Sequence, residues 1–317
     1  MLPGSRHRPA SEEQKTLAER KQPLRLRARI LQVLRAFFLA HHYLEVETPL
    51  LIPAPAPEPH IDAVPVGDHF LHPSPELCMK RLVCAGYDRI FQICRCFRHA
   101  ERGQFHLPEF TLLEWYRTGI DYLGLMEECE ALILWLSEHL GLEPQITYQG
   151  IPIDLKPPWE RLSVKDAFHR YASRSLKDAL EAERFDELMV QEVEPRLGMN
   201  KPTLLKDYPG SMAALSRLKA EDPGIAERFE LYVAGLELAN GFSELNDTEE
   251  QTARFERDQR QRRAMHKTVY PMPETFLEAL DKMPDCAGIA LGVDRLVMLF
   301  SDAPRIDDAV TFTPEEL

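Results

Sequence analysis

The stretch FQICRCFRHAERGQFHLPEFTLLEWYR, residues 91–117, constrains the fold of this chain more than any other. It predicts two strands, Phe91–Arg98 and Glu109–Tyr116, joined by a polar loop. Side chains alternate between the two faces of a strand. The residues that share a face are Cys94, Cys96 and Arg98 on one strand, and Phe110, Leu112, Glu114 and Tyr116 on the other. If both sets lie on one side of the sheet, that side can hold a phosphate, a base and a cationic amine. The alternative is an ordinary hairpin whose polar residues face water.

The composition describes the kind of protein and limits its partners. Of the 317 residues, 44% are hydrophobic and 28% are charged, which is typical of a soluble globular protein. No apolar run has the length of a membrane span, and the first residues contain no hydrophobic signal segment. We therefore expect a cytoplasmic protein with no membrane partner. The formal net charge of −13 disfavours a nucleic acid as the main partner, because phosphate backbones bind basic surfaces.

The six cysteines include no C-x-x-C pair. Cys94 and Cys96 have a spacing that suits zinc poorly, and His99 nearby does not complete a set of ligands. We expect reduced, mostly buried thiols rather than a metal site.

Three stretches of the chain carry a family resemblance. The segment FRHAERGQFHLPEFTLLEWYR resembles motif 2 of the class II aminoacyl-tRNA synthetases in its lysine-type form. ELANGFSELND at 237–247 and GIALGVDRLVMLF at 288–300 follow in the family's order, and the latter looks like motif 3. The likeness runs from about Leu24 to Phe312. It implies a class II catalytic core of mixed α/β (α+β) class, with a mainly antiparallel sheet flanked by helices.

The resemblance also implies a domain organisation. We expect residues 1–317 to form a single synthetase-like catalytic domain, with a helical insertion at about 156–200. Lysyl-tRNA synthetase carries an anticodon-binding β-barrel ahead of motif 1. Here only about twenty residues precede that motif, too few for a five-stranded barrel, so we expect no anticodon-binding domain.

Periodicity places the remaining elements. A helix is predicted from Pro23 to about His42, followed by a short strand at Leu44–Thr48. This unit resembles motif 1, which forms the dimer interface in class II synthetases, and so implies a homodimer; simple core packing explains its apolar stripe equally well. Other predicted elements are a helix at Tyr122–Leu140, a hairpin at Ile146–Leu155, helical structure at Ser163–Leu197, a strand at Lys201–Pro209, two strands within Glu227–Leu245, a helix at Thr248–His266, a strand at Gly288–Leu291 and a helix from Gly292 to Phe300.

A proline run precedes the central hairpin. Pro53, Pro55, Pro57 and Pro59 occupy alternate positions, which favours an extended loop that serves as a stiff connector; binding a partner is the less favoured role. Beyond it, Ser74-Pro75-Glu76 has the residues of a helix start.

The resemblance implies a site that joins an amino acid to AMP with ATP and Mg²⁺. Arg98 and Arg295 are the candidate catalytic residues, for the α- and γ-phosphates respectively, because a guanidinium matches phosphate geometry. Glu230 and Glu237 are the candidate magnesium ligands. Phe110 is expected to stack on adenine. The full ATP-binding set is Arg98, His99, Ala100, His106, Leu107, Phe110, Glu237, Leu238, Gly292 and Arg295.

The expected amino-acid pocket is rich in acidic groups. Its residues are Ser74, Pro75, Glu76, Glu114, Tyr116, Asn240, Phe242, Glu244 and Ala290. Several carboxylates close together repel one another unless a cation joins them. A substrate with two ammonium groups meets that demand, whereas an acidic or neutral amino acid does not. The pocket is therefore expected to bind a diamino acid.

Three positions depart from the lysyl-tRNA synthetase pattern. Ala100 stands where the family has an adenine-contacting glutamate, although Glu101 is adjacent, and Leu107 stands where asparagine is common. Ala290 replaces a glycine, and its methyl group suits an amine moved one carbon along the substrate. Because of this change and the missing barrel, the sequence resembles the short lysyl-tRNA synthetase paralogues. These proteins ligate β-lysine to a lysine of elongation factor P. Two alternatives stay open: an enzyme that charges tRNA, and a non-catalytic amino-acid sensor.

Overall fold

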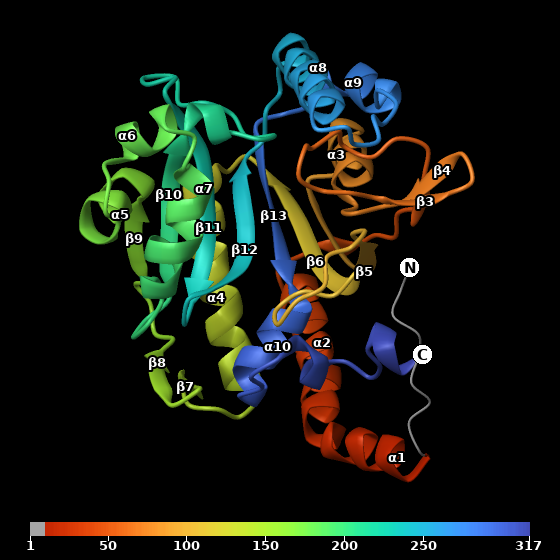
Figure 1. The fold of residues 1–317 in the computed structure, drawn as a ribbon, viewed down its shortest axis with the longest axis vertical. Coiled ribbons are helices and arrows are strands. Elements are labelled where there is room, and N and C mark those ends of the chain that lie inside the picture. The colour runs from red at the N-terminus through yellow and green to blue at the C-terminus, as the bar shows by residue number, and fades with distance from the viewer. Residues whose placement is uncertain (1–9) are drawn as a thin grey trace.

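The architecture is built on one large, mostly antiparallel sheet (Figure 1). The computed structural model describes residues 10–317. In spatial order the strands are β1 (Leu44–Glu45), β5 (Arg89–Phe97), β6 (Glu109–Thr118), β13 (Cys286–Gly292), β12 (Leu236–Ser243), β11 (Ile225–Val233), β10 (Thr203–Pro209) and β9 (Glu160–Ser163). The two outermost pairs, β1 with β5 and β9 with β10, are parallel. The predicted mixed class with a mainly antiparallel sheet is confirmed.

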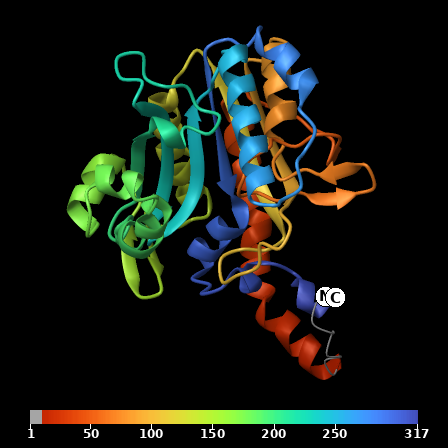
Figure 2. The same ribbon diagram turned by 45° about the horizontal axis from the view of Figure 1, so that its top comes forward.

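Helices cover both faces of this sheet. One face packs against α2 (Lys21–Ala40), α4 (Tyr122–His139) and α10 (Val293–Ser301), and the largest buried cluster lies there. The other face carries α3 (Glu76–Cys84), α8 (Thr248–Ala264) and α9 (Glu274–Leu280), which lie side by side (Figures 1 and 2). On β6 the alternation is clear, because Trp115 belongs to the first cluster and Tyr116 to the second.

The register of the central hairpin answers the question that its sequence raised. Cys96 is paired with Phe110, and Gln92 with Glu114, across β5 and β6. Directly opposite residues of an antiparallel pair point to the same face. The polar sets on the two strands therefore lie on one side of the sheet, so the condition stated for a shared binding face is met.

The N-terminal segment differs from its prediction. Helix begins at Ala10 with α1 (Ala10–Glu19), and α2 starts at Lys21. Pro23 thus lies inside the first turn of α2, where its missing N–H has no intrahelical partner to lose. The following strand ends at Glu45 rather than at Thr48.

Smaller elements complete the fold. Pro53–Pro59 is irregular, and next to it β2 (Leu51–Ile52), β4 (His69–Leu71) and β3 (Val64–Val66) form a small sheet that the sequence did not predict. The hairpin of β7 (Gln145–Tyr148) and β8 (Ile151–Asp154) turns at Gln149-Gly150, both with positive φ. The predicted helical stretch is broken into α5 (Val164–Tyr171), α6 (Leu176–Glu181), α7 (Phe185–Leu188), a π turn at Met189–Val193 and a 3-10 turn at Glu194–Arg196. Further 3-10 turns lie at Gly210–Met212, Ile306–Ala309 and Pro314–Glu316.

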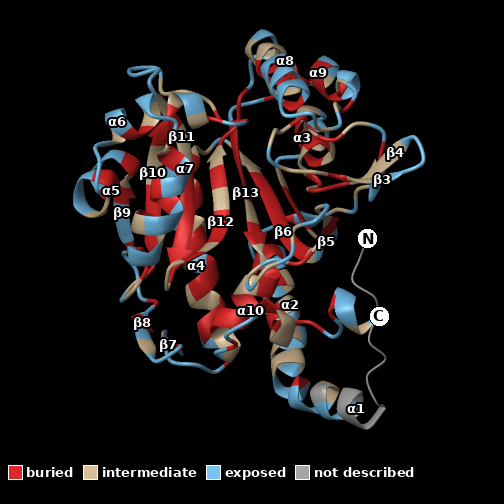
Figure 3. Ribbon diagram, in the orientation of Figure 1, coloured by how far each residue is buried: buried red, intermediate tan, exposed pale blue. Residues whose placement is uncertain are grey.

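Burial follows the layers (Figure 3). The sheet and the inward faces of its helices are buried, while the outward faces of α5, α6 and α8 are exposed. Among the described residues, no helix combines the length and apolar character that crossing a membrane requires. All six cysteines are free thiols. The Sγ atoms of Cys94 and Cys96 lie 3.8 Å apart beside His72. The Nε2 atom of His72 is 2.7 Å from the carbonyl oxygen of Arg95.

Candidate active site

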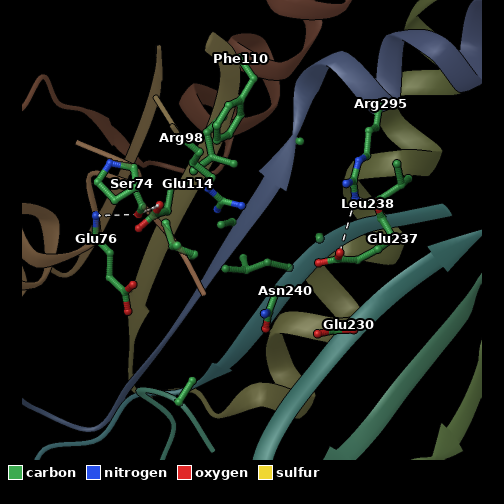
Figure 4. A pocket seen from close by; sticks show the side chains of 18 of the residues that line it. Ser74, Glu76, Arg98, Phe110, Glu114, Glu230, Glu237, Leu238, Asn240 and Arg295 are labelled. Atoms are coloured by element: carbon green, nitrogen blue, oxygen red, sulfur yellow. Dashed lines mark hydrogen bonds and ion pairs between the residues drawn. The ribbon is translucent and has the colours of Figure 1, made fainter. Parts of the chain in front are cut away.

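A cavity of about 430 Å³ opens on the face of the sheet that carries α3 and α8. Its floor is formed by β6, β12 and β13 (Figure 4). Its walls are formed by the loop around Glu58 and by the segment from Arg98 to Leu107. The predicted site residues that line it are Ser74, Glu76, Arg98, His106, Leu107, Phe110, Glu114, Tyr116, Glu230, Glu237, Leu238, Asn240, Phe242, Ala290, Gly292 and Arg295. Segments far apart in the sequence thus converge on one cavity.

Glu114 is at the centre of a hydrogen-bonded group on one side of the cavity. Ser74 Oγ donates to Glu114 Oε2 at 2.8 Å (Figure 4). The Tyr116 hydroxyl donates to Glu114 Oε1 at 2.6 Å. Ser74 Oγ also accepts from the N–H of Glu76 at 3.0 Å, where α3 begins. Burial, and then the charge of Glu76, raises the pKa of the Glu114 carboxyl to about 8. This wall therefore favours an incoming cation.

Glu244 lies behind this wall rather than on it. It is 2% exposed, and its Oε1 has no hydrogen-bond partner within the described chain. The Lys80 ammonium is 2.6 Å from its Oε2 and 2.6 Å from Glu76 Oε1. Burial raises the pKa of the Glu244 carboxyl to about 8, although Lys80 opposes the shift. Gly288 makes room for this arrangement, since a Cβ there would stand 2.4 Å from Glu244 Oε1 and 2.3 Å from Tyr116 Cε1.

Arg98 carries unused donors beside the cavity. Its guanidinium carbon lies 5.1 Å from the centre of the Phe110 ring, and its nearest carboxylate, Glu101, is 3.7 Å away. Its Nε is buried and has no hydrogen-bond partner among residues 10–317. A buried donor without a partner costs free energy, and an anionic ligand would remove that cost.

Arg295 joins β12 to the loop between β5 and β6. It donates from Nη1 to the carbonyl oxygen of Glu237 at 2.6 Å, and from Nε to that of Phe105 at 3.3 Å (Figure 4). Its Nη2 lies 2.6 Å from His106 Nε2. Burial, and then the charges of Arg295 and Arg98, lower the pKa of His106 to about 4. The neutral imidazole therefore accepts from Arg295 at neutral pH, which holds the loop against α10.

Glu230 and Glu237 differ in how many partners they already have. Glu230 accepts from Arg228 at 2.5 Å and from the hydroxyls of Tyr208 and Tyr232 at 2.6 and 2.7 Å. Glu237 is 39% exposed, and burial together with the charge of Glu230 raises its pKa. Two like charges on neighbouring strands fit a divalent cation, for which Glu237 is the more accessible ligand.

Ala290 occupies the centre of the cavity floor. In the sheet register it is paired with Asn240 on one side and with Glu114 on the other. Its methyl group therefore lies between the side chains of two predicted substrate-binding residues.

Four predicted site residues do not line the cavity: Pro75, His99, Ala100 and Glu244. Pro75 is the cap position of α3, and the N–H of His99 donates to the Asp62 carbonyl oxygen at 2.6 Å. Ala100 has φ of +62°, and this turn is followed by Glu101, which does line the cavity.

Sequence reasoning missed several charged residues of this region, among them Glu58, Lys80 and Arg228. Glu58 and Arg228 line the cavity, and Lys80 neutralises part of the acidic cluster. Only Lys80 carried a usable signal, because it follows Glu76 by four residues on a predicted helix, which is the spacing of an ion pair.

Comparison with known proteins identifies related chains. The family described as tRNA synthetases class II (D, K and N) matches residues 14–316. The elongation factor P–(R)-β-lysine ligase of Mannheimia succiniciproducens is 40% identical over 307 residues, covering 90% of this chain and 93% of that protein. The protein of the same name from Proteus mirabilis is 40% identical over 311 residues, with coverage of 90% and 93%. That from Vibrio atlanticus is 38% identical over 306 residues, with coverage of 91% and 94%.

Proposed function

This chain belongs to the class II tRNA synthetases (D, K and N), and we propose that it is an ATP-dependent, AMP-forming ligase for β-lysine. It activates (R)-β-lysine as the aminoacyl-adenylate and transfers the acyl group to the ε-amine of a lysine on elongation factor P. The relatives named for this activity align with about nine-tenths of this chain. The rest of the proposal comes from the cavity.

The observation that carries the proposal is the charge balance of the amino-acid end of the cavity. Glu76 and Glu244 share a single ammonium, that of Lys80, and the charge of Glu76 also acts on Glu114. If ionised, three carboxylates and one ammonium leave two negative charges. The two ammonium groups of a diamino acid match that charge, whereas an acidic or neutral amino acid leaves part of it unbalanced.

Activation requires positively charged side chains that bind the phosphates of ATP. The carboxylate oxygen of the diamino acid attacks the α-phosphorus, and pyrophosphate leaves with the electrons of the broken P–O bond. Arg98, whose buried Nε lacks a partner in the described chain, binds the developing charge on the α-phosphoryl oxygens. Arg295 binds the γ-phosphate. Phe110 stacks on the adenine through the face of its ring that Arg98 does not cover.

Glu237, with support from Glu230, would hold Mg²⁺. The bound cation would neutralise phosphate charge during activation. Three donors fix the Glu230 carboxylate in place: Tyr208, Tyr232 and Arg228.

A homodimer is part of the proposal. Leu39, Leu44 and Leu51 are 58%, 50% and 46% exposed near the edge strand β1. Exposed apolar side chains beside an unpaired strand edge mark an interaction surface. Light scattering on Leu44→Asp tests this part separately, and an unchanged mass would contradict it.

The deciding experiment compares substrates and acceptors. We expect ATP–pyrophosphate exchange with (R)-β-lysine to exceed exchange with α-lysine or the other enantiomer. Labelled β-lysine is expected on elongation factor P, and label on tRNA alone would overturn the assignment. Arg98→Ala should abolish exchange and keep the fold. The matched control is Arg95→Ala, an exposed arginine three residues earlier on β5, which should exchange normally.

A further inference from the structure

The proline-rich loop is more than a connector, because part of it forms a wall of the cavity. Glu58, His60 and Ile61 all line the cavity. Glu58 stands between Pro57 and Pro59, so its backbone has few alternatives to an extended conformation. The backbone that carries this charged side chain is therefore fixed at the cavity wall.

Two basic side chains that are about two hundred residues away in the sequence anchor this loop. Arg262, which is fully buried, donates from Nη1 to the carbonyl oxygens of Glu58 and Ile61 at 2.7 and 3.0 Å. Its Nη2 lies 2.6 Å from Asp62 Oδ1, and Lys267 Nζ donates to the Pro59 carbonyl oxygen at 2.9 Å. A surface loop would not need such anchoring, whereas a residue that must meet a reacting atom does.

The charged groups that face Glu58 come from four elements. They are Glu76 on α3, Arg98 after β5, Asp258 on α8 and Arg228 on β11. Glu76 belongs to the proposed diamino-acid end of the cavity, and Arg98 is the proposed ligand of the α-phosphate. The mixed anhydride bond of an aminoacyl-adenylate, between the acyl carbon and a phosphate oxygen, connects those two ends. With the adenylate bound between them, Glu58, which lines the same cavity, would lie beside the bond that the acceptor amine must break.

From this placement we propose that Glu58 is the general base of the second half-reaction, the transfer of the acyl group to the acceptor amine. The inference rests on the proposed function and adds to it, since the family motifs provide no base for this step.

Transfer requires a free amine at the acceptor and a group that takes up its remaining proton. The acceptor ammonium first gives one proton to water. The free amine then attacks the acyl carbon, the bond from that carbon to the phosphate oxygen breaks, and AMP leaves with the electron pair. The nitrogen becomes positively charged as its new bond forms, and its proton passes to the Glu58 carboxylate. Solvent removes that proton before the next turnover.

The electrostatic surroundings suit this role. Burial, and then the charge of Glu76, raises the pKa of Glu58 to about 7, whereas Arg98 and Arg228 oppose the shift. A general base works best when its pKa lies near the working pH. Activation of the amino acid requires no proton transfer of this kind, so Glu58 should matter to the second half-reaction alone.

The test separates the two half-reactions in Glu58→Gln. Pyrophosphate exchange with β-lysine should remain within about twofold of the wild type. Transfer to elongation factor P from the preformed adenylate, in a single turnover, should fall about 100-fold, the lower end for loss of a general base. Hydroxylamine, which is largely unprotonated at pH 7, should still capture the acyl group at the wild-type rate. The control variant is Asp68→Asn, an exposed carboxylate in the turn between β3 and β4, which should behave as wild type in all three assays.

The outcomes are distinct. Wild-type transfer should rise with pH around neutrality, and Glu58→Gln should lack that inflection. Normal transfer by Glu58→Gln would overturn the inference and leave the proposed function intact. Equal loss of transfer and hydroxamate formation would also overturn it, because it would indicate a positioning defect. Absence of exchange in the wild type would instead overturn the proposed function itself.

Discussion

The ammonium of Lys80 lies 2.6 Å from Glu244 Oε2, and the two side chains are 1% and 0% exposed. The same ammonium reaches Glu76, so one buried cation serves two carboxylates. This contact corrects the sequence argument, which left the compensation of the acidic cluster to the substrate. The chain supplies one positive charge itself, so the three carboxylates, if ionised, still require two positive charges from a ligand.

Removing that internal cation should lower the free energy of unfolding by an amount that depends on pH. In Lys80→Met, Glu244 and Glu76 lose their shared partner, and an uncompensated buried charge costs about 3–5 kcal/mol. Protonation of the carboxylates relieves the cost, so the loss should be large at pH 8 and small at pH 5. Urea unfolding at the two pH values measures this. The double variant Lys80→Met/Glu244→Gln should regain part of the lost stability, and an equal loss at both pH values would contradict the explanation.

The acidic cluster should also make the free protein less stable as pH rises. Glu114 and Glu244 have pKa values raised to about 8 from 4.5, so the folded state holds protons that the unfolded state releases. Their contribution to stability is complete below pH 4.5 and is lost as pH rises through 8. A bound diamino acid replaces those protons, so the shift of the melting temperature by β-lysine should be larger at pH 8 than at pH 6. Glu114→Gln should flatten this dependence, and a smaller shift at pH 8 in the wild type would refute it.

Much of the fold was predictable because its signals are local. The faces of β5 and β6, the turn at Ala234-Gly235 with positive φ at both residues, and the start of α10 after Gly292 follow from alternation, turn residues and periodicity. The breaks between α5, α6 and α7 were not predicted, because the ends of short helices depend on what the segment packs against.

The site was predictable only where family motifs exist. The motifs supplied Arg98, Glu237 and Arg295, and the cavity brings these together. Glu58 has no local signal, since a glutamate among prolines is typical of an exposed loop. Its place in the cavity depends on Arg262, about two hundred residues away, and such long-range contacts leave no trace in a single sequence.

A single methyl group at Gly288 should disable the amino-acid end of the cavity. A Cβ at this position would stand 2.3 Å from Tyr116 Cε1 and 2.4 Å from Glu244 Oε1. Both side chains are buried and have little room to move, so Gly288→Ala should displace them at a cost of about 1–3 kcal/mol in stability. We expect KM for β-lysine to rise at least tenfold and KM for ATP to change little. Exchange kinetics measure both constants, and an equal rise in the two would indicate a general defect instead.

Ala290→Gly should shift preference from β-lysine toward α-lysine. The Ala290 methyl lies on the cavity floor between Asn240 and Glu114, so it occupies the space that an amine one carbon nearer the carboxylate would use. Removing one methyl group from a substrate pocket changes discrimination by about 1–3 kcal/mol, or at least tenfold in relative kcat/KM. Pyrophosphate exchange with the two amino acids measures the ratio. A glycine also loosens a strand, and Ala287→Gly controls for this, because Ala287 lies on the same strand but is packed in the core on the opposite face. If both variants change the ratio equally, backbone flexibility and not the missing methyl group sets the preference.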